Sequence, residues 1–375
     1  MTQQVKLPII INGQISPADD VDAYQFQGKS GDEITVEVYA RRLNSPLDSL
    51  LRLTDASGKV LEWNDDYVAK DMAFLFKDAE GLLTHHADSY LAAKLPADGT
   101  YSVQLTDSQH HGGSAYGYPL HLTTKTPDFA LRITPSSLSL LPGEVVPITV
   151  YVLRKDGFDG EINVSLKGAP SGFKLDGSRI PGGCEHIRMT LRAPKKAPDK
   201  PVALKLQGIA RVGEKTITHE AVPAEDMMQA FLYRHLVRSQ EFLVVLRDAR
   251  WPVPSVELPN DKPIEIPAGG SVQVHLKSNA RQFMKDLHLQ LLDPPDGVSL
   301  HDVTRGPDGL ILTLKADSTV EKGLADNLII EASKEPAPAG KDAKAVKNRR
   351  RRSVRAIPAI PIRVTAPLPK DNEKS

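Results

Sequence analysis

Three adjacent polar side chains follow a strand-like run in the stretch LEWNDDYVAK, residues 61–70. The run ends at Trp63, and Asn64, Asp65 and Asp66 come directly after it. Ca²⁺ takes six to eight oxygen ligands from carboxylates, amides and backbone carbonyls. The stretch therefore has three interpretations, which are a calcium site, a hydrated turn rich in Asn and Asp, and a catalytic pair of carboxylates.

Two more aspartates are candidates for the same site. Asp88 opens a later strand-like segment and Asp22 opens an earlier one. If these strand ends meet at one edge of a β-sandwich, a structural Ca²⁺ site is predicted. A catalytic pair needs a fixed carboxylate separation and a substrate cleft, and the sequence indicates neither. The predicted metal ligands are Asn64, Asp65, Asp66, Asp88 and Asp22.

Two histidine doublets, His85-His86 and His110-His111, are the other possible metal ligands. Neighbouring residues of an extended strand point to opposite faces, so a doublet does not chelate one ion easily. Zinc sites usually space their ligands by two to five residues and add a third ligand. The pattern therefore favours histidines in loops over a transition-metal site.

Nucleophilic catalysis has little support in the sequence. The single cysteine, Cys184, lies in IPGGCEHIR with His186 two residues later. A catalytic cysteine needs a positioned histidine and an activating environment, whereas GGC before a strand is typical of a turn. The chain also lacks the G-x-S-x-G, H-E-x-x-H and P-loop patterns. We therefore expect a protein that is not an enzyme.

Exposed aromatic rings are a further means of binding, because flat rings stack on sugars. The candidates for such a ligand surface are Trp63, Tyr67, Tyr116 and Tyr118. For Trp63, packing at the core or edge of a sheet is the alternative interpretation. The basic run KNRRRRSVR has no aromatic residue among its cations, so it favours a hydrated loop, with weak attraction to acidic polysaccharide, over nucleic-acid binding.

The composition limits the classes of protein that need to be considered. Lys and Arg number 47, as do Asp and Glu, so there is no chain-wide positive field for nucleic acid. One cysteine excludes an internal disulfide. The 29 prolines and 26 glycines, with 5% aromatic residues, favour many short strands and tight turns. A length of 375 residues predicts two to four domains.

Alternation of apolar and polar residues predicts antiparallel strands throughout the first third of the chain. Turn signals such as GKSGDE, DASGK and PADGT separate the segments, and no helical pattern comes between them, which is typical of a β-sandwich. The predicted strands are DAYQFQ (22–27), EITVEVYA (33–40), LDSLLRLTD (47–55), SYLAAKL (89–95), TYSVQLTD (100–107) and YPLHLTT (118–124).

Two stretches of this region resemble the bacterial pre-peptidase C-terminal domain. They are VDAYQFQGKSGDEITVEVYARRLNSPLDSLLRLTDASGKVLEWNDD and DSYLAAKLPADGTYSVQLTDS, and the resemblance covers residues 12–124. It implies a jelly-roll-like sandwich, usually non-catalytic and appended to secreted peptidases or other exported proteins. Calcium and polymer binding are implied by the similar collagen-binding modules. One departure is the insertion YVAKDMAFLFKDAEGLLTHHA between NDD and DS.

The rest of the chain contains an internal duplication at a spacing of roughly 125 residues, too long for a solenoid repeat. SLSLLPGEVVPITVYVLR matches PIEIPAGGSVQVHLKSN, and IRMTLRAP matches LILTLKAD. Both copies resemble bacterial immunoglobulin-like modules. The prediction is all-β, with three antiparallel sandwiches in tandem. The predicted parts are 1–126 (pre-peptidase C-terminal-like), 127–222 (immunoglobulin-like), 223–250 (a connector or short helix), 251–366 (immunoglobulin-like, with a disordered basic loop at 334–356) and 367–375 (a disordered tail).

The start of the sequence bears on its cellular location. MTQQVKLPIIINGQIS has no apolar signal-peptide core, and no run of about 18 apolar residues could span a membrane. The residues alone allow a cytosolic protein or a fragment of an exported one, and the resemblance favours the fragment. We expect a secreted or envelope protein whose signal peptide lies outside this sequence. Its expected role is adhesion, targeting or stabilisation, or else binding of a polysaccharide or protein polymer for a hydrolase.

Overall fold

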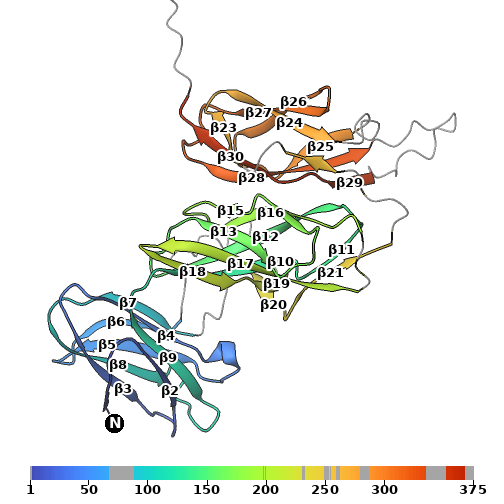
Figure 1. The fold of residues 1–375 in the computed structure, drawn as a ribbon. Coiled ribbons are helices and arrows are strands. Elements are labelled where there is room, and N and C mark those ends of the chain that lie inside the picture. The colour runs from blue at the N-terminus through green and yellow to red at the C-terminus, as the bar shows by residue number, and fades with distance from the viewer. Residues whose placement is uncertain are drawn as a thin grey trace, which may run out of the picture. The chain divides into compact units, whose positions relative to one another are not determined.

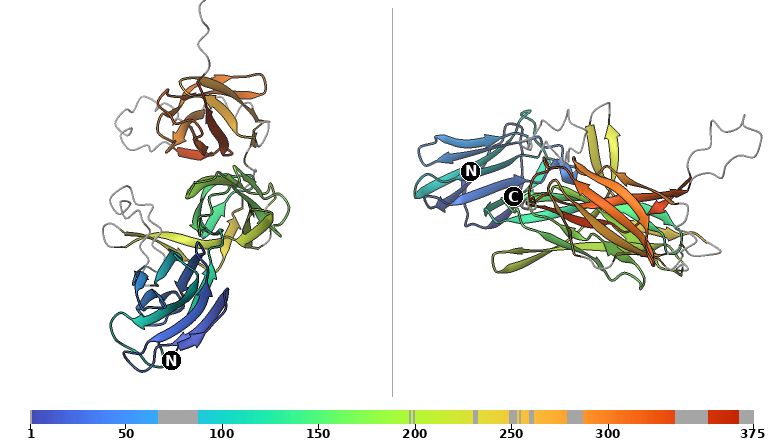
Figure 2. Two further views of the ribbon diagram at one scale, coloured as in Figure 1. Left: turned by 90° about the vertical axis from the view of Figure 1, so that its left-hand side faces the viewer. Right: turned by 90° about the horizontal axis from the view of Figure 1, so that it is seen from above.

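The computed structural model describes most of the chain, in two compact units. The first unit contains 1–128, 155–158 and 226–237, and the second contains 129–154, 159–225 and 238–375. Figures 1 and 2 show the strands of both units in several orientations. The described ranges are 2–66, 88–196, 198, 200–229, 233–248, 253, 255–258, 262–278, 287–334 and 352–367.

The first unit holds a two-sheet sandwich, coloured blue to teal in Figure 1. One sheet has the order β1-β3-β8-β5-β6, and the other has the order β2-β9-β4-β7. A single 3₁₀ turn, η1 (Arg41–Leu43), follows β4. The strands are β1 (Thr2–Gln4), β2 (Ile9–Gln14), β3 (Asp22–Gly28), β4 (Glu33–Val38), β5 (Ser49–Asp55), β6 (Val60–Asn64), β7 (Tyr90–Lys94), β8 (Gly99–Asp107) and β9 (Gly117–Thr124).

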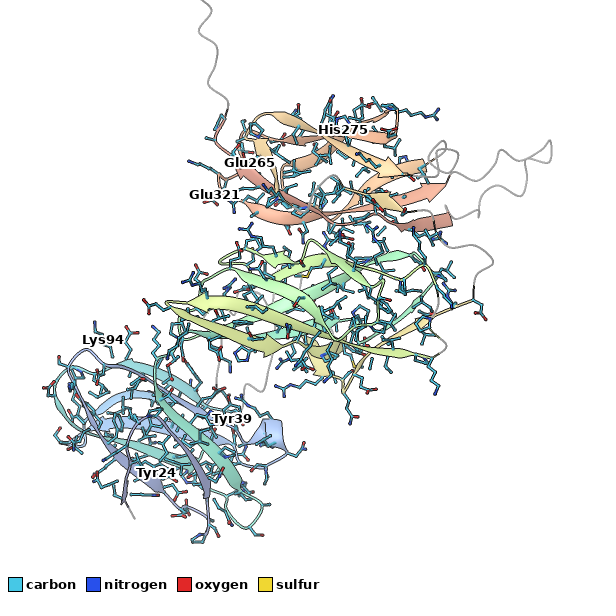
Figure 3. All side chains as sticks on the ribbon, viewed as in Figure 1. Tyr24, Tyr39, Lys94, Glu265, His275 and Glu321 are labelled. Atoms are coloured by element: carbon cyan, nitrogen blue, oxygen red, sulfur yellow. The ribbon has the colours of Figure 1, made fainter. Side chains whose placement is uncertain are left out.

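All six strands expected from alternation in this region are present, within a few residues of the predicted ends. Their alternate residues point into one core, which contains Phe26, Val36, Leu53 and Leu105. Tyr24 lies in this core, while Lys94 is exposed on β7 (Figure 3). The hydrophobic pattern therefore fixes which face of each strand is buried, as the period-2 geometry of a strand requires.

A tight turn joins β5 to the edge strand β6 and so positions Trp63 and Asn64. The Asp55 carboxylate accepts hydrogen bonds from the backbone N–H groups of Ser57 (2.9 Å) and Lys59 (3.1 Å). Gly58 adopts φ +85°, which glycine tolerates without strain. DASGK is thus a turn held by its own aspartate, as such residues favour.

Two further sandwiches lie mainly in the second unit, although residues 226–237 of the earlier one are counted with the first unit. The first of them has sheets β14-β16-β12-β10-β19-β20 and β11-β21-β17-β13-β15, with β18 paired to β17. Its strands are β10 (Asp128–Thr134), β11 (Ser137–Leu140), β12 (Val145–Lys155), β13 (Ile162–Lys167), β14 (Lys174–Asp176), β15 (Arg179–Ile180), β16 (His186–Arg192), β17 (Val202–Val212), β18 (Lys215–Glu220), β19 (Val222–Gln229), β20 (Tyr233–Arg238) and β21 (Phe242–Leu246).

The last sandwich repeats this plan. Its sheets are β26-β27-β24-β22 and β23-β30-β28-β25, with β29 paired to β28. The repeated strands match one for one in sheet order, including the parallel pair β11–β21, which corresponds to β23–β30. The strands are β22 (Val256–Glu257), β23 (Ile264–Pro267), β24 (Ser271–Ser278), β25 (Leu287–Leu292), β26 (Val298–Arg305), β27 (Gly309–Ala316), β28 (Ala325–Lys334), β29 (Arg352–Ala356) and β30 (Ile360–Thr365).

Two local expectations are wrong. The short helix predicted within 223–250 is replaced by β19, β20 and β21, because strand pairing along this segment overrides the helix-like spacing of its apolar residues. The disordered loop predicted at 334–356 is contradicted only at its two ends, because Lys334 belongs to β28 and Arg352–Ala356 form β29, which pairs with β28. Residues 335–351 and 368–375 lie outside the described residues. No helix in the described ranges is long and apolar enough to cross a membrane.

Candidate functional site

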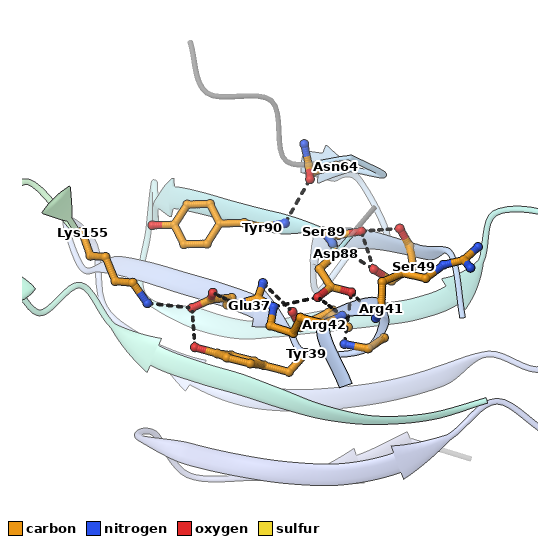
Figure 4. Close-up of polar contacts among 12 residues, drawn as sticks. Glu37, Tyr39, Arg41, Arg42, Ser49, Asn64, Asp88, Ser89, Tyr90 and Lys155 are labelled. Atoms are coloured by element: carbon orange, nitrogen blue, oxygen red, sulfur yellow. Dashed lines mark hydrogen bonds and ion pairs between the residues drawn. The ribbon is translucent and has the colours of Figure 1, made fainter. Parts of the chain in front are cut away.

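The residues after β6 form a hydrogen-bonded strand end against the start of β7 (Figure 4). The Asn64 amide nitrogen donates to the backbone oxygen of Asp66 (2.8 Å), and its amide oxygen accepts from the backbone N–H of Tyr90 (3.0 Å). Asp65 accepts from the backbone N–H of Asp66 (3.0 Å). The side-chain amide of Asn64 therefore fixes the strand end through one donated and one accepted hydrogen bond.

A buried pair of serines fastens this strand end to the sandwich. Ser49 on β5 and Ser89 are both fully buried, and their hydroxyl oxygens lie 2.8 Å apart. The backbone N–H of Ser89 donates to the Ser49 hydroxyl (2.9 Å), and the Ser89 hydroxyl is 2.9 Å from the backbone oxygen of Asp65. Buried polar groups need such partners, so the pair holds β5, β7 and the NDD segment together.

Asp88 faces the turn after β4 and is fully buried. Its carboxylate accepts hydrogen bonds from the backbone N–H groups of Ala40 (3.1 Å), Arg41 (2.7 Å) and Arg42 (3.3 Å). It also accepts from the Arg42 side chain, with 2.7 Å between Nε and Oδ2. These four donors and the positive guanidinium already balance the carboxylate, as buried charges require.

Arg42 connects Asp88 to a second polar group on the same sandwich (Figure 4). Its Nη1 donates to Glu37 (2.8 Å), and its guanidinium carbon lies 4.1 Å from the ring centre of Tyr39. The Tyr39 ring in turn stacks on that of His121, at 4.3 Å between centres. Burial acts to lower the pKa of Arg42, but the carboxylates of Asp88 and Glu37 outweigh it and raise this pKa. The cluster is a pairing of charges that orders the turn.

Asp22 is held in a different place. It accepts a hydrogen bond from the Tyr118 hydroxyl (2.5 Å), which lies 2.8 Å from the Tyr24 hydroxyl. Strand register puts Asp22 opposite Leu105, Leu105 opposite Leu51, and Leu51 opposite Asn64. Asp22 and Asn64 are thus three strand spacings apart, about 14 Å. One cation cannot bind both.

The structure therefore divides the five predicted metal ligands into three places. Asn64, Asp65 and Asp66 remain together, Asp88 is bound to Arg42, and Asp22 is bound to Tyr118. Within the described ranges, no three His, Cys, Asp or Glu side chains are grouped closely enough to hold a metal ion. The two adjacent carboxylates and nearby carbonyl oxygens suit Ca²⁺ by donor type, but they fill only part of its usual shell of six to eight oxygens.

Of the four aromatic residues predicted to form a ligand surface, the structure leaves one exposed and buries another. Trp63 is 57% exposed on β6, as a ligand platform requires. Tyr118 is only 2% exposed, so the prediction that it lies on the surface is wrong: its alternation with Leu120 and Leu122 turns it into the core. Tyr116 packs partly against that core, and Tyr67 lies outside the described residues.

The histidines and the cysteine have ordinary surroundings. His110 lies 2.8 Å from Asp19, whereas His111 lies 3.9 Å from Asp107, so the two rings of this doublet have different partners. His85 and His86 lie outside the described residues. Burial raises the pKa of the Cys184 thiol, which lowers its thiolate fraction and makes it a poor nucleophile.

Sequence reasoning missed Arg42 as the partner of Asp88 and Ser49 as the partner of Ser89. Each pair joins residues 40 or more positions apart. For the serine pair, the sequence signal was limited to SPLDS and ADS, which lie at the starts of two predicted strands. Only the pairing of strands at the sandwich edge brings them together.

Comparisons with known proteins give three similarities. The chain is 43% identical over 88 residues to a probable subtilase-type serine protease of Deinococcus radiodurans. The aligned stretch covers 23% of this chain and 10% of that protein. The chain thus matches only a tenth of the length of that relative. No protein-family model matches.

Two solved structures are also similar. The first is the pre-peptidase C-terminal domain of a collagenase from Bacillus anthracis, with 15% identity, a TM-score of 0.22, and coverage of 33% of this chain and 95% of that one. The second is domains 4–9 of the surface layer protein SbsC, with 9% identity, a TM-score of 0.25, and coverage of 84% of this chain and 47% of that one.

Proposed function

We propose that this chain is a non-catalytic accessory region of an exported bacterial peptidase, and that it attaches its parent protein to an extracellular polymer. The observation that carries the proposal is the stretch of 88 residues shared with a probable subtilase-type protease. A segment of this length has the size of one small β-sandwich rather than of a whole enzyme. We infer that the stretch is an appended part of that protein, of which it covers 10%, and we assign the same role here.

The chemistry of the described residues supports a binding role over a catalytic one. Two carboxylates of the first unit are used in structural contacts, Asp88 with Arg42 and Asp22 with Tyr118. The Cys184 thiol has a raised pKa. By contrast, Trp63 is a large apolar side chain left exposed, and exposed aromatic groups are typical of binding surfaces.

The test is sedimentation of the whole chain with insoluble polymers, namely chitin, cellulose, peptidoglycan sacculi and fibrous collagen, beside an assay of casein hydrolysis. We expect saturable binding to at least one polymer and no hydrolysis. If the chain binds none of the four polymers, attachment to a polymer is contradicted. Casein hydrolysis by the purified chain would contradict the non-catalytic assignment.

A further inference from the structure

One cross-strand row on the outer face of the first sandwich carries side-chain polar groups that bond to no other described residue. Trp63 on β6 is directly opposite Arg52 on β5, and Arg52 is directly opposite Gln104 on β8. Directly opposed residues of antiparallel strands share one face of the sheet. The indole, the guanidinium and the amide therefore stand side by side over about 10 Å, which is two strand spacings.

Other side chains of the same face form hydrogen bonds with one another, unlike the side chains of this row. The Gln4 amide donates to Gln25 (2.6 Å), and the Gln27 amide donates to Thr100 (2.9 Å). Within the described part of the chain, no hydrogen bond or ion pair joins the side chain of Trp63, Arg52 or Gln104 to another residue. Arg52 is exposed, and Trp63 is 57% exposed. The row thus places a cation that has no partner among the described residues beside an exposed aromatic surface.

We propose that the row Trp63–Arg52–Gln104 binds an acidic polysaccharide whose sugar rings carry carboxylates. The indole face offers a flat apolar surface for the C–H face of a sugar ring. The Arg52 guanidinium matches a carboxylate in charge and in its paired N–H geometry. The Gln104 amide can both donate to and accept from ring hydroxyls. The proposal rests on the polymer-binding function above and names the polymer and its site.

Other partners fit this row less well. A protein interface is anchored by a cluster of buried aromatic and apolar residues, whereas the row has one aromatic ring. A neutral polysaccharide would leave the guanidinium without a counter-charge. Nucleic acid requires several cations along its phosphates, and the row supplies one.

The experiment is a calorimetric titration of the whole chain with tetragalacturonate and, separately, with its fully methyl-esterified form. The two ligands share the same sugar rings and differ in their charge. We expect the acid to bind roughly tenfold or more tightly than the ester, since a charge-assisted bidentate pair is the stronger hydrogen bond. The preference should shrink as salt is raised, because screening weakens exposed charges.

Three variants locate the binding. Arg52→Gln should bind the acid and the ester equally, and Trp63→Ala should weaken both ligands. Lys94→Gln removes an exposed cation from β7 of the same sandwich and should leave both affinities unchanged. All three positions are exposed, so the substitutions should leave thermal unfolding unchanged. A loss of binding can then be attributed to the substituted side chain rather than to unfolding.

The outcomes also separate this proposal from the proposed function. Binding to the insoluble polymers with no heat from tetragalacturonate would overturn the acidic-polysaccharide site and leave attachment intact. Heat that survives in Arg52→Gln and Trp63→Ala but disappears in Arg349→Gln/Arg350→Gln would assign the binding to the basic run, and would equally overturn the proposal. Absence of binding to every polymer and to both sugars would overturn the site and the proposed function together.

Discussion

The Asp88 carboxylate and the Arg42 guanidinium lie 2.7 Å apart in the first sandwich, with the side chain of Asp88 fully buried. The same carboxylate caps three consecutive backbone N–H groups, those of Ala40, Arg41 and Arg42. Asp88, which was predicted as a metal ligand, therefore connects the start of β7 to the turn after β4. Its charge is satisfied by the protein, and no cation is required to balance it.

Asp88→Ala should destabilise the first sandwich by about 3–5 kcal/mol, because it leaves a charged guanidinium and three backbone donors without their acceptor. Urea unfolding, with hydrogen exchange read in β4 and β7, measures the loss. Glu62→Ala is the control, since Glu62 is exposed on β6 and should cost no more than about 0.5 kcal/mol. Equal effects of the two substitutions would contradict the structural role of Asp88.

Gly13→Ala should destabilise the same sandwich by about 1–3 kcal/mol, the usual cost of overpacking. A Cβ at Gly13 on β2 would overlap the ring of Tyr118, which the core and the hydrogen bond to Asp22 hold in place. Gly99→Ala on β8 is the matched control, because a Cβ there meets nothing within 4 Å. Thermal unfolding of both variants provides the comparison, and an unchanged Tm for Gly13→Ala would show that Tyr118 can move aside.

Asp22 should make stability depend on pH. Burial raises its folded-state pKa above the ordinary 3.8, while the hydrogen bond from Tyr118 acts to lower it. The protonated form is thus favoured on folding, so the contribution is fully present below about 3.8 and is lost as pH rises through the folded-state pKa. Asp22→Asn cannot ionise, so its Tm relative to the parent should rise between acidic and neutral pH. A constant difference across this range would refute the assignment.

Strand positions could be predicted from the sequence where the pattern was strictly local. Alternation predicted six of the nine strands of the first sandwich, and the duplicated motifs predicted two similar sandwiches, whose repeated strands match in sheet order. The same alternation places Tyr118 beside Leu120 inside the core, so its burial was predictable in principle. The pairing of Asp88 with Arg42 was not, because residues 46 positions apart meet only through the register of β4 with β7. Hydrophobic alternation and turn residues depend on neighbours in the sequence, whereas a site is formed by residues that are far apart in the sequence.

Calcium binding is the last prediction, and the structure limits its strength. Only Asn64, Asp65 and Asp66 stay together, and the Asn64 side-chain oxygen already accepts the N–H of Tyr90. Such a partial set of ligands should bind Ca²⁺ no more tightly than about 10⁻⁴–10⁻³ M, the range of weak extracellular modules. Calorimetric titration of the EDTA-treated chain tests this.

Asp65→Asn/Asp66→Asn should abolish the heat of calcium binding, whereas Asp22→Asn should leave it unchanged, because Asp22 lies about 14 Å away along the strand register. Micromolar affinity would mean that further ligands complete the shell, and would contradict the limit set by these three residues. Heat that disappears in Asp22→Asn would contradict the separation of the two places. Absence of heat up to millimolar Ca²⁺ would leave NDD as a hydrogen-bonded turn that fixes the end of β6, directly beside the exposed ring of Trp63.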